Sequence, residues 1–480
     1  MRRRLLVAVL LLSVPAFAEE APVEQPPTNR ELQEQIKRLE QRLRELEQKP
    51  APPPAVVTPP PPPPKRQPLD LREPPFGEYD FSWMNGTNRQ PASLLTTGPL
   101  TWSLYVDAYY GWQFWAPVDH TVFPSTTAPR HNEIGFNLAT LGVELNLDGP
   151  IGRIYLQYGS NVETDAGQDP TGARGFFLTA KAFQFIQQAA AGWHFHWLHG
   201  VNLEIGIFPS YVALESYLPQ ENWNYTHALM SDSTPYYFFG IRSQLYVTQR
   251  LKLELWLVNG WQTFGQWHEG RAGGYLLNWR PREWVSLTTA AYFGQEVQND
   301  PGSVRIYFDS YAQLRYYKGK STRSIRSAAI CFVIDAGYEK RTTPDWQPSG
   351  AIVGASVTHR VEWTSKWATT LRGDLFWDPT QALIPKLPLG SPYLLPTQAQ
   401  NGVPAEPFLG GGITLTQDFI PSPWIVARLE YAHREANVPY FSGPGGITGP
   451  GGVAAQNFNT FTPDLKKRDD RILFNVTLRL

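Results

Sequence analysis

The sequence predicts an all-β membrane protein: a transmembrane antiparallel β-barrel of about 16 strands, with a short N-terminal periplasmic coiled coil and a proline-rich linker. Three observations lead to this prediction. From residue 102 onward, apolar and polar residues alternate in segments of about ten residues. Short and long connections between these segments also alternate. Charged residues occupy the middle of the polar faces.

The composition excludes several classes of protein. The 480 residues carry 42 Lys and Arg against 43 Asp and Glu, whereas a nucleic-acid binder should carry a clear basic excess. A single Cys excludes an internal disulfide framework and a thiolate-rich metal site. Only 18% of the residues are charged while 13% are aromatic, which indicates an apolar, aromatic surface.

The N-terminus has the pattern of a secretory signal peptide, which we assign to residues 1–18. Arginines at 2–4 precede an apolar run over 5–17, and residues 16–18 form a small-x-small cleavage site. The alternative is an uncleaved anchor, although the run is shorter than the ~20 residues of a membrane-spanning helix. No later stretch approaches ~18 continuous apolar residues, so the exported chain is either soluble or a barrel.

Residues 30–49 are predicted to form a coiled-coil segment. Their apolar positions follow the heptad pattern, at Leu32, Ile36, Leu39, Leu43 and Leu46. About two and a half heptads are too few for a stable coiled coil, so an attached oligomer would have to hold the helices together. A solitary amphipathic helix is the alternative. The linker that follows, 50–79, should be extended and stiff over its proline run.

The barrel is expected over residues 80–480. The last segment alternates most clearly, since Ile472, Phe474 and Val476 face one way while Arg471 and Asn475 face the other. A strand of about ten residues, tilted by about 40°, covers about 25 Å, the height of the apolar band of an outer membrane. The predicted strands are 102–114, 134–148, 151–160, 181–196, 201–208, 236–248, 250–261, 271–281, 283–294, 304–317, 326–340, 349–362, 365–378, 408–419, 423–435 and 470–480.

The connections indicate antiparallel hairpins. Tight joints at 148–150 and 198–200 alternate with long ones at 115–133, 161–180 and 209–235. Barrels make this pattern when the short turns face the periplasm and the long loops face outside. An even number of strands puts both chain ends on the short-turn side, so we expect the coiled coil in the periplasm.

The charges distinguish a barrel from a soluble β-sandwich or propeller, which would also alternate. Mid-strand charges such as Asp107, Glu254 and Asp309 need water, which the lumen of a closed barrel supplies while the apolar face meets lipid. Closure also removes every sheet edge. Aromatic residues cluster near segment ends, as at 109–112 and 236–239, in the manner of interfacial girdles.

Several stretches of the chain resemble the putative beta-barrel porin family, the OmpL-like group. They are DFSWMNGTNRQ at 80–90, the stretch 204–209, Tyr225 with 240–242, and 258–261. With the terminal strand, the resemblance covers roughly residues 80–480. It implies an outer-membrane, pore-forming barrel without an assigned substrate.

We therefore expect a passive, water-filled channel for small hydrophilic solutes, because about sixteen strands leave room for one. Loop 209–235 either folds inward and narrows the channel, with its carboxylates facing arginines across the lumen, or remains an ordinary outer loop. The predicted pore-lining and constriction residues are Glu215, Glu221, Arg153, Arg242, Arg305, Asp309, Arg360, Arg372, Asp374, Arg428 and Glu430. Their mixed sign predicts no strong ion selectivity.

Other functions are also considered. Two alternative functions remain: a structural or adhesive barrel with a closed lumen, and a substrate-specific channel. An enzyme is not expected, because the chain has no GxSxG motif and no evident His, Ser and acid set on one face. His194, His196 and His199 resemble a metal cluster, yet alternation alone explains their spacing. No metal and no cofactor are expected.

The expected partners follow from the barrel. They are outer-membrane lipid, lipopolysaccharide near the basic run 466–468, and small hydrophilic solutes, with no nucleic acid. Porin architecture and the heptad segment together predict a homotrimer. The expected location is the outer membrane of a Gram-negative bacterium, with the N-terminal segment in the periplasm.

Overall fold

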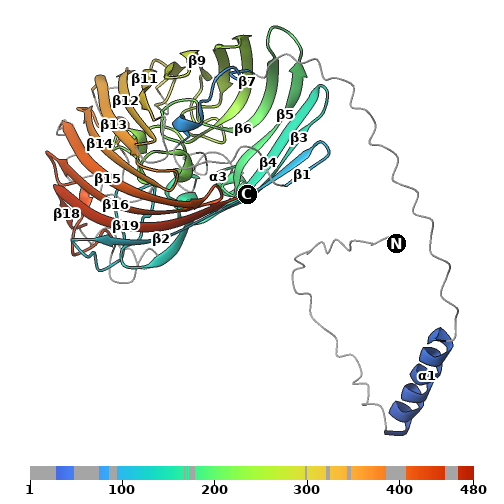
Figure 1. Cartoon of the computed structure of the whole chain (residues 1–480). Coiled ribbons are helices and arrows are strands. Elements are labelled where there is room, and N and C mark those ends of the chain that lie inside the picture. Colours follow the sequence, from blue (N-terminus) through green and yellow to red (C-terminus); the bar gives the residue numbers. More distant parts are fainter. Residues whose placement is uncertain are drawn as a thin grey trace. The chain divides into compact units, whose positions relative to one another are not determined.

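The architecture comes from a computed structural model of the whole chain (Figure 1). The structure describes residues 29–47, 75–85, 95–166, 169, 171, 179–297, 300–319, 325–342, 348–384, 407–448 and 463–480. The chain divides into two units, residues 1–71 and 72–480, and each is described by itself.

The first unit contains one helix, α1 (Asn29–Glu47). It covers most of the predicted coiled-coil segment 30–49, and Ile36 and Leu39 of the heptad seam are 53% and 64% exposed. These two apolar side chains are therefore uncovered in the single chain, and pairing between copies stays a prediction. The signal peptide 1–18 and the linker 50–79 up to residue 74 lie outside the described residues. None of the described helices is long and apolar enough to cross a membrane.

The second unit is a closed antiparallel β-barrel. Its wall consists of sixteen long strands that pair in chain order, and the last pairs with the first (Figure 1). The two-residue strand β1 (Thr96–Thr97) pairs with the first residues of the first long strand. The long strands are β2 (Leu100–Gln113), β3 (Ile134–Asn146), β4 (Pro150–Tyr158), β5 (Ile186–Phe195), β6 (Val201–Pro209), β7 (Tyr237–Thr248), β8 (Leu251–Val258), β9 (Ala272–Arg282), β10 (Val285–Gly294), β11 (Val304–Lys318), β12 (Ser327–Lys340), β13 (Gly350–Glu362), β14 (Trp367–Asp378), β15 (Phe408–Ser422), β16 (Ile425–Ala436) and β19 (Arg468–Arg479).

The observed strands confirm the predicted fold class. Each predicted segment coincides with one long strand, and the start of β5 differs most, at Ile186 against the predicted residue 181. The reason is a short helix, α3 (Thr179–Phe183), which occupies the positions before the strand. The short run Thr-Ala-Lys-Ala-Phe at 179–183 suits either state, so alternation alone could not place this boundary.

The connections alternate in length as the sequence predicts. The turns from β3 to β4 and from β5 to β6 are short, whereas the connection from β6 to β7 spans residues 210–236. Gly149 and Gly200 adopt φ of +112° and +116° in the two short turns, a conformation that disfavours any side chain. We call the two ends of the barrel the short-turn end and the long-loop end.

The two faces of the wall differ as expected. Inward-facing Asp107, Arg372 and Glu430 are 1% exposed or less. The outward face carries large exposed apolar side chains, among them Ile154, Ile205, Leu255, Phe293, Phe308, Ile334, Leu371, Leu375, Ile413, Leu415, Leu429, Ile472, Phe474 and Val476. Exposed tryptophans lie at the short turns, at Trp197, Trp284, Trp363 and Trp367. This distribution is typical of a lipid-facing barrel with an interfacial girdle.

Part of the interior is packed with aromatic side chains. Tyr211 stacks on Trp256 with ring centroids 4.7 Å apart, and Phe238 lies 5.0 Å from Tyr211. These rings belong to a large buried cluster whose members come from the strands β5 to β16 and from the loops, and which includes Cys331. The lumen is therefore not an even tube, because side chains fill the region next to these strands.

The segment 75–85, which contains the 3-10 helix η1 (Ser82–Met84), is seated at the short-turn end. Arg250, in the turn between β7 and β8, binds Glu78 through two nitrogens at 2.5 and 2.7 Å. Trp83 is buried and donates from Nε1 to the carbonyl of Glu283, in the turn between β9 and β10, at 3.0 Å. Two short turns therefore hold the segment that precedes the barrel.

Candidate functional site

The connection between β6 and β7 lies inside the barrel. It includes the 3-10 helices η4 (Pro219–Glu221) and η5 (Ser231–Ser233), and its residues Trp223, Tyr225 and His227 are 7% exposed or less. The connection contacts β2, β11, β13, β14, β15, β16 and β19. Loop 209–235 therefore folds inward and crosses the lumen toward the opposite wall. It does not have the course of an ordinary outer loop.

Arg428 of β16 holds the middle of the loop by its backbone. Its guanidinium donates to the carbonyls of Pro219, Asn222 and Asn224 at 2.6, 2.9 and 3.3 Å. Its Nε lies 3.2 Å from the carboxylate of Asp418 on β15. A buried guanidinium needs several partners, and here the loop supplies them in place of water.

Glu430 and Arg372 hold the next part of the loop. Glu430 accepts from the backbone N–H groups of Tyr225 and Thr226 at 2.6 and 3.0 Å. Arg372 of β14 donates to the carbonyl of Thr226 at 2.6 Å and pairs with Glu215 of the loop at 2.5 Å. Donors and acceptors of the wall thus match acceptors and donors of one stretch of backbone, which fixes the position of the loop.

A charged cluster anchors the end of the loop. Arg434 of β16 pairs with Asp232 at 3.0 Å and donates to the carbonyl of His227. Burial alone would raise the pKa of Asp232, but Arg434 and the hydrogen bond to His227 outweigh burial and lower the pKa to about 2. Burial would lower the pKa of His227, but the hydrogen bond to Asp232 outweighs burial and raises it. Both groups therefore favour the charged, paired state.

Three further predicted residues also contact the loop. Asp309 accepts from the backbone N–H of Ala213 at 2.9 Å, and Asp374 accepts from that of Leu229 at 3.2 Å. Arg360 donates to the carbonyl of Trp223 at 3.3 Å. These side chains therefore face the loop from β11, β14 and β13.

The other predicted wall residues lie away from these contacts. Arg153 and Arg242 both pair with Glu204, in a group of three that runs across β4, β6 and β7. Arg305 pairs with Glu339 across β11 and β12. The structure therefore brings together Glu215, Glu221, Asp309, Arg360, Arg372, Asp374, Arg428 and Glu430 around the loop, and it places the remaining three on other parts of the wall.

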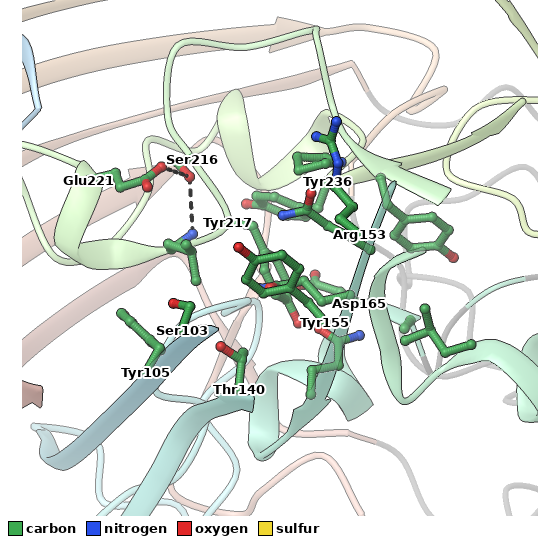
Figure 2. Close-up of a pocket in the computed structure, with 18 of the residues that line it drawn as sticks. Ser103, Tyr105, Thr140, Arg153, Tyr155, Asp165, Ser216, Tyr217, Glu221 and Tyr236 are labelled. Atoms are coloured by element: carbon green, nitrogen blue, oxygen red, sulfur yellow. Dashed lines mark hydrogen bonds between the residues drawn. The ribbon is translucent and has the colours of Figure 1, made fainter. Parts of the chain in front are cut away.

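Two cavities lie on either side of the loop. The short-turn cavity, about 320 Å³, is lined by β2 to β5, the loop, and Arg479 of β19 (Figure 2). The long-loop cavity, about 580 Å³, is lined by residues 121–129, Trp261, Glu296 and Arg305 among others. Asp165 and Tyr236 line both cavities. These two residues therefore lie at the boundary between the two spaces.

Several residues of the site were missed by sequence reasoning. Arg434 continues the even-numbered inward positions of Arg428 and Glu430, so alternation could have identified it. Asp165 lies just after the short helix α2 (Ser160–Thr164), in a connection without periodicity. No pattern in the sequence places it beside Tyr236.

Two of the three histidines at the short-turn end are hydrogen-bonded to other side chains. His194 lies 2.7 Å from the side-chain oxygen of Asn202, and His196 lies 2.7 Å from Asp148. Among the residues that the structure describes, no group of three or more His, Cys, Asp or Glu side chains is arranged to hold a metal ion.

A family model matches most of the barrel. The family is described as putative beta-barrel porin-2, OmpL-like, and the match covers residues 99–463. The chain belongs to this family. This porin therefore forms an outer-membrane channel, as the resemblance implied. The match includes the stretches 204–209 and 258–261, while 80–90 lies before it.

Solved structures of other outer-membrane proteins are similar in outline. In vitro-folded OmpT of Vibrio cholerae has 9% identity and a TM-score of 0.45, covering 81% of this chain and 100% of its own. The anion-selective porin from Comamonas acidovorans has 9% identity and a TM-score of 0.46, covering 79% and 99%. OprB of Pseudomonas putida has 9% identity and a TM-score of 0.47, covering 80% and 94%. No curated protein matches the chain.

Proposed function

We propose that this porin lets small hydrophilic solutes diffuse passively through a lumen that loop 209–235 narrows. The observation that supports this most directly is the pair of cavities on either side of the loop, which share Asp165 and Tyr236. A solute that passes from one cavity to the other passes these two side chains. The passage therefore runs through these two cavities, beside β2 to β5 at the short-turn cavity, while the aromatic cluster around Tyr211 fills other parts of the interior.

The charges of the wall act on selectivity mainly through the loop. Arg360, Arg372, Arg428 and Glu430 are each 2% exposed or less, so they face the loop and not open water. A charge that is paired and covered contributes little to the field in the open passage. Size and hydrogen bonding at the boundary between the cavities should therefore govern passage more than net charge.

Conductance in a planar bilayer tests the channel. We expect ohmic single-channel steps from the purified protein, with a small reversal potential in a salt gradient, because the lumen carries both signs of charge. A correctly inserted but silent barrel would contradict the proposal. It would favour a structural or adhesive barrel with a closed lumen.

We further infer that three copies associate and that α1 holds their N-terminal segments together in the periplasm. Ile36 and Leu39 support this, because both apolar side chains of the heptad seam are exposed in the single chain. The short-turn end is then periplasmic, since the segment 75–85 is bound there and α1 precedes it.

Deletion of residues 31–49 tests this assembly. We expect light scattering of the detergent-solubilised protein to give three chains for the native form and a weaker trimer for the deletion. A matched control replaces Glu34 and Glu40, outside the heptad seam, by Gln. A native protein that is already monomeric would contradict the proposal.

A further inference from the structure

Apart from Asp165, charged side chains that line the short-turn cavity already have partners. Arg479 pairs with Glu221 at 2.7 Å, and Arg153 pairs with Glu204 just outside the lining. Glu144 accepts from the hydroxyl of Tyr155 at 2.8 Å. An ionic solute would have to break or compete with these contacts, so the cavity is not prepared for an ion.

The buried polar atoms without a partner in this cavity are hydroxyl, amide and carboxyl oxygens. Three of them are Tyr217 Oη, Gln157 Oε1 and Asp165 Oδ2, for which the described part of the chain provides no hydrogen bond. They come from the loop, from β4 and from the connection after α2. Buried polar groups are normally paired, so three such atoms around one space indicate a ligand or water that pairs with them.

The protonation of Asp165 fits a neutral ligand. Burial, together with the nearby carboxylate of Asp232, raises the pKa of Asp165 well above its usual range. A protonated carboxyl donates one hydrogen bond and accepts others, as a hydroxyl does. The three groups therefore offer donors and acceptors without formal charge.

Aromatic rings complete the lining. Tyr105, Tyr155, Tyr217, Tyr236 and Tyr237 all line the cavity, and Figure 2 shows the first four close together around it. The rings of Tyr217 and Tyr236 lie 5.8 Å apart, centroid to centroid, at a tilt of 57°. Such rings present flat apolar faces beside polar edges, which suits a ligand with C–H faces and hydroxyl edges.

We propose that the short-turn cavity is a binding site for a neutral polyhydroxylated solute of about monosaccharide size, such as an uncharged sugar or polyol. This inference rests on the proposed channel, of which the cavity is one half. The volume of about 320 Å³ lies at the small end of the range for ligand pockets. A bound solute would occupy the passage, so binding would be measurable as a loss of ion current.

The test adds glucose to the native protein in a planar bilayer. We expect the ion conductance to fall along a saturation curve, since a site can be filled only once. Tetraethylene glycol dimethyl ether is the comparison solute, because it is neutral but has no hydroxyl donors. It should lower the conductance only in proportion to its concentration, through viscosity.

A pair of matched variants locates the effect. Tyr217→Phe removes only an unpartnered hydroxyl, and we expect half-maximal block to need about five-fold more glucose, which corresponds to about 1 kcal/mol. Tyr338→Phe is the control, because Tyr338 is 47% exposed on the outer face of β12. Glucose should block this variant at the same concentration as the native protein. Each block is expressed relative to the variant's own conductance in salt.

The outcomes separate this inference from the channel itself. Equal, non-saturating effects of glucose and the ether on a conducting protein would overturn the binding site and leave the channel standing. An inserted protein without conductance would overturn the channel. In that case calorimetric titration of the detergent-solubilised protein with glucose decides the site, since one glucose bound per chain supports it and no heat of binding overturns it.

Discussion

Arg428 shows how a single wall residue keeps the loop in place. It donates to three loop carbonyls and pairs with Asp418, and it is 1% exposed. Arg428→Gln keeps a polar group but removes the charge and most of the donors. We expect the free energy of unfolding to fall by about 3–5 kcal/mol, because Asp418 and the loop carbonyls lose a buried partner. Denaturant titration in detergent micelles measures this change.

The matched control for this variant is Arg468→Gln. Arg468 pairs with Asp470 at 2.6 Å, but its side chain is 55% exposed. Surface pairs of this kind contribute about 1 kcal/mol or less. Similar losses for Arg428→Gln and Arg468→Gln would show that the loop contacts do not stabilise the barrel.

Asp232 predicts an acid sensitivity of the loop anchor. Its pKa is lowered to about 2, against about 3.9 in an unfolded chain, so its contribution to stability is present above pH 3.9 and is lost as the pH falls toward 2. We expect roughly 2 kcal/mol to be lost over that interval. Thermal unfolding at pH 5 and pH 2 measures it. The decrease should be smaller in Asp232→Asn, and an equal decrease would contradict the assignment to this group.

At the scale of residues, alternation predicted which side chains face inward but not what they meet there. Asp309 and Arg360 were expected to face water, yet each binds the backbone of the loop. The reason is that period two is a local property, while the course of loop 209–235 depends on contacts between residues 96 or more positions apart, such as these two. Asp165 has no periodic pattern around it at all.

Loop 209–235 is the element that sets the width of the passage. Replacing residues 212–234 by a short Gly-Ser link would uncover the arginines of β13 to β16. We expect the single-channel conductance to rise roughly two-fold or more, because the passage would widen. The reversal potential should stay small, because Arg360, Arg372 and Arg428 would face water together with Asp374, Asp418 and Glu430. Reversal potential in a salt gradient measures the selectivity.

The control for the loop deletion checks that the shortened chain still folds into a barrel. Far-ultraviolet circular dichroism and resistance to unfolding in cold detergent should show that the shortened barrel is formed. An intact barrel with native conductance would contradict the view that the loop narrows the lumen.

At the scale of elements, all the long strands could be predicted, whereas the short helices could not. Each strand of a barrel has one face toward apolar surroundings and one toward the interior, so each strand carries its own alternation of apolar and polar residues. The helix α3 and the 3-10 helices η4 and η5 lie in connections whose conformation depends on the wall that they contact. Their sequences alone are compatible with several states.

The apolar outer surface of the whole barrel predicts where a substituted arginine destabilises the protein most. Leu415 lies at the middle of β15 and is 46% exposed, facing outward. We expect Leu415→Arg to make folding into lipid vesicles less favourable by about 2–4 kcal/mol, since an arginine at this depth is costly in the apolar band. Val247→Arg, near the short-turn end of β7, is the control and should cost about 1 kcal/mol or less. Equal costs would contradict the placement of the apolar band.

For the whole molecule, closure and the even number of strands followed from the sequence because the alternation of connection lengths has only one simple geometric solution. The off-centre passage did not follow from it. It depends on the aromatic cluster around Tyr211, Phe238 and Trp256, whose members come from different strands and from the loop. Each of these rings is an ordinary strand-end aromatic when considered alone.

The seam between β2 and β19 also governs the order in which the barrel can fold. The strands β2 and β19 lie side by side (Figure 1). Asp107 accepts from Asn475 and Thr477, and Leu104 exchanges backbone hydrogen bonds with Leu480. Closing so long a stretch of chain carries a large entropy cost that local contacts cannot offset early, so folding should be slow. Until the final strand arrives, two strand edges remain open to other chains. An unfinished barrel therefore exposes edges that chaperones would have to protect, and the pairing of β19 with β2 ends that exposure.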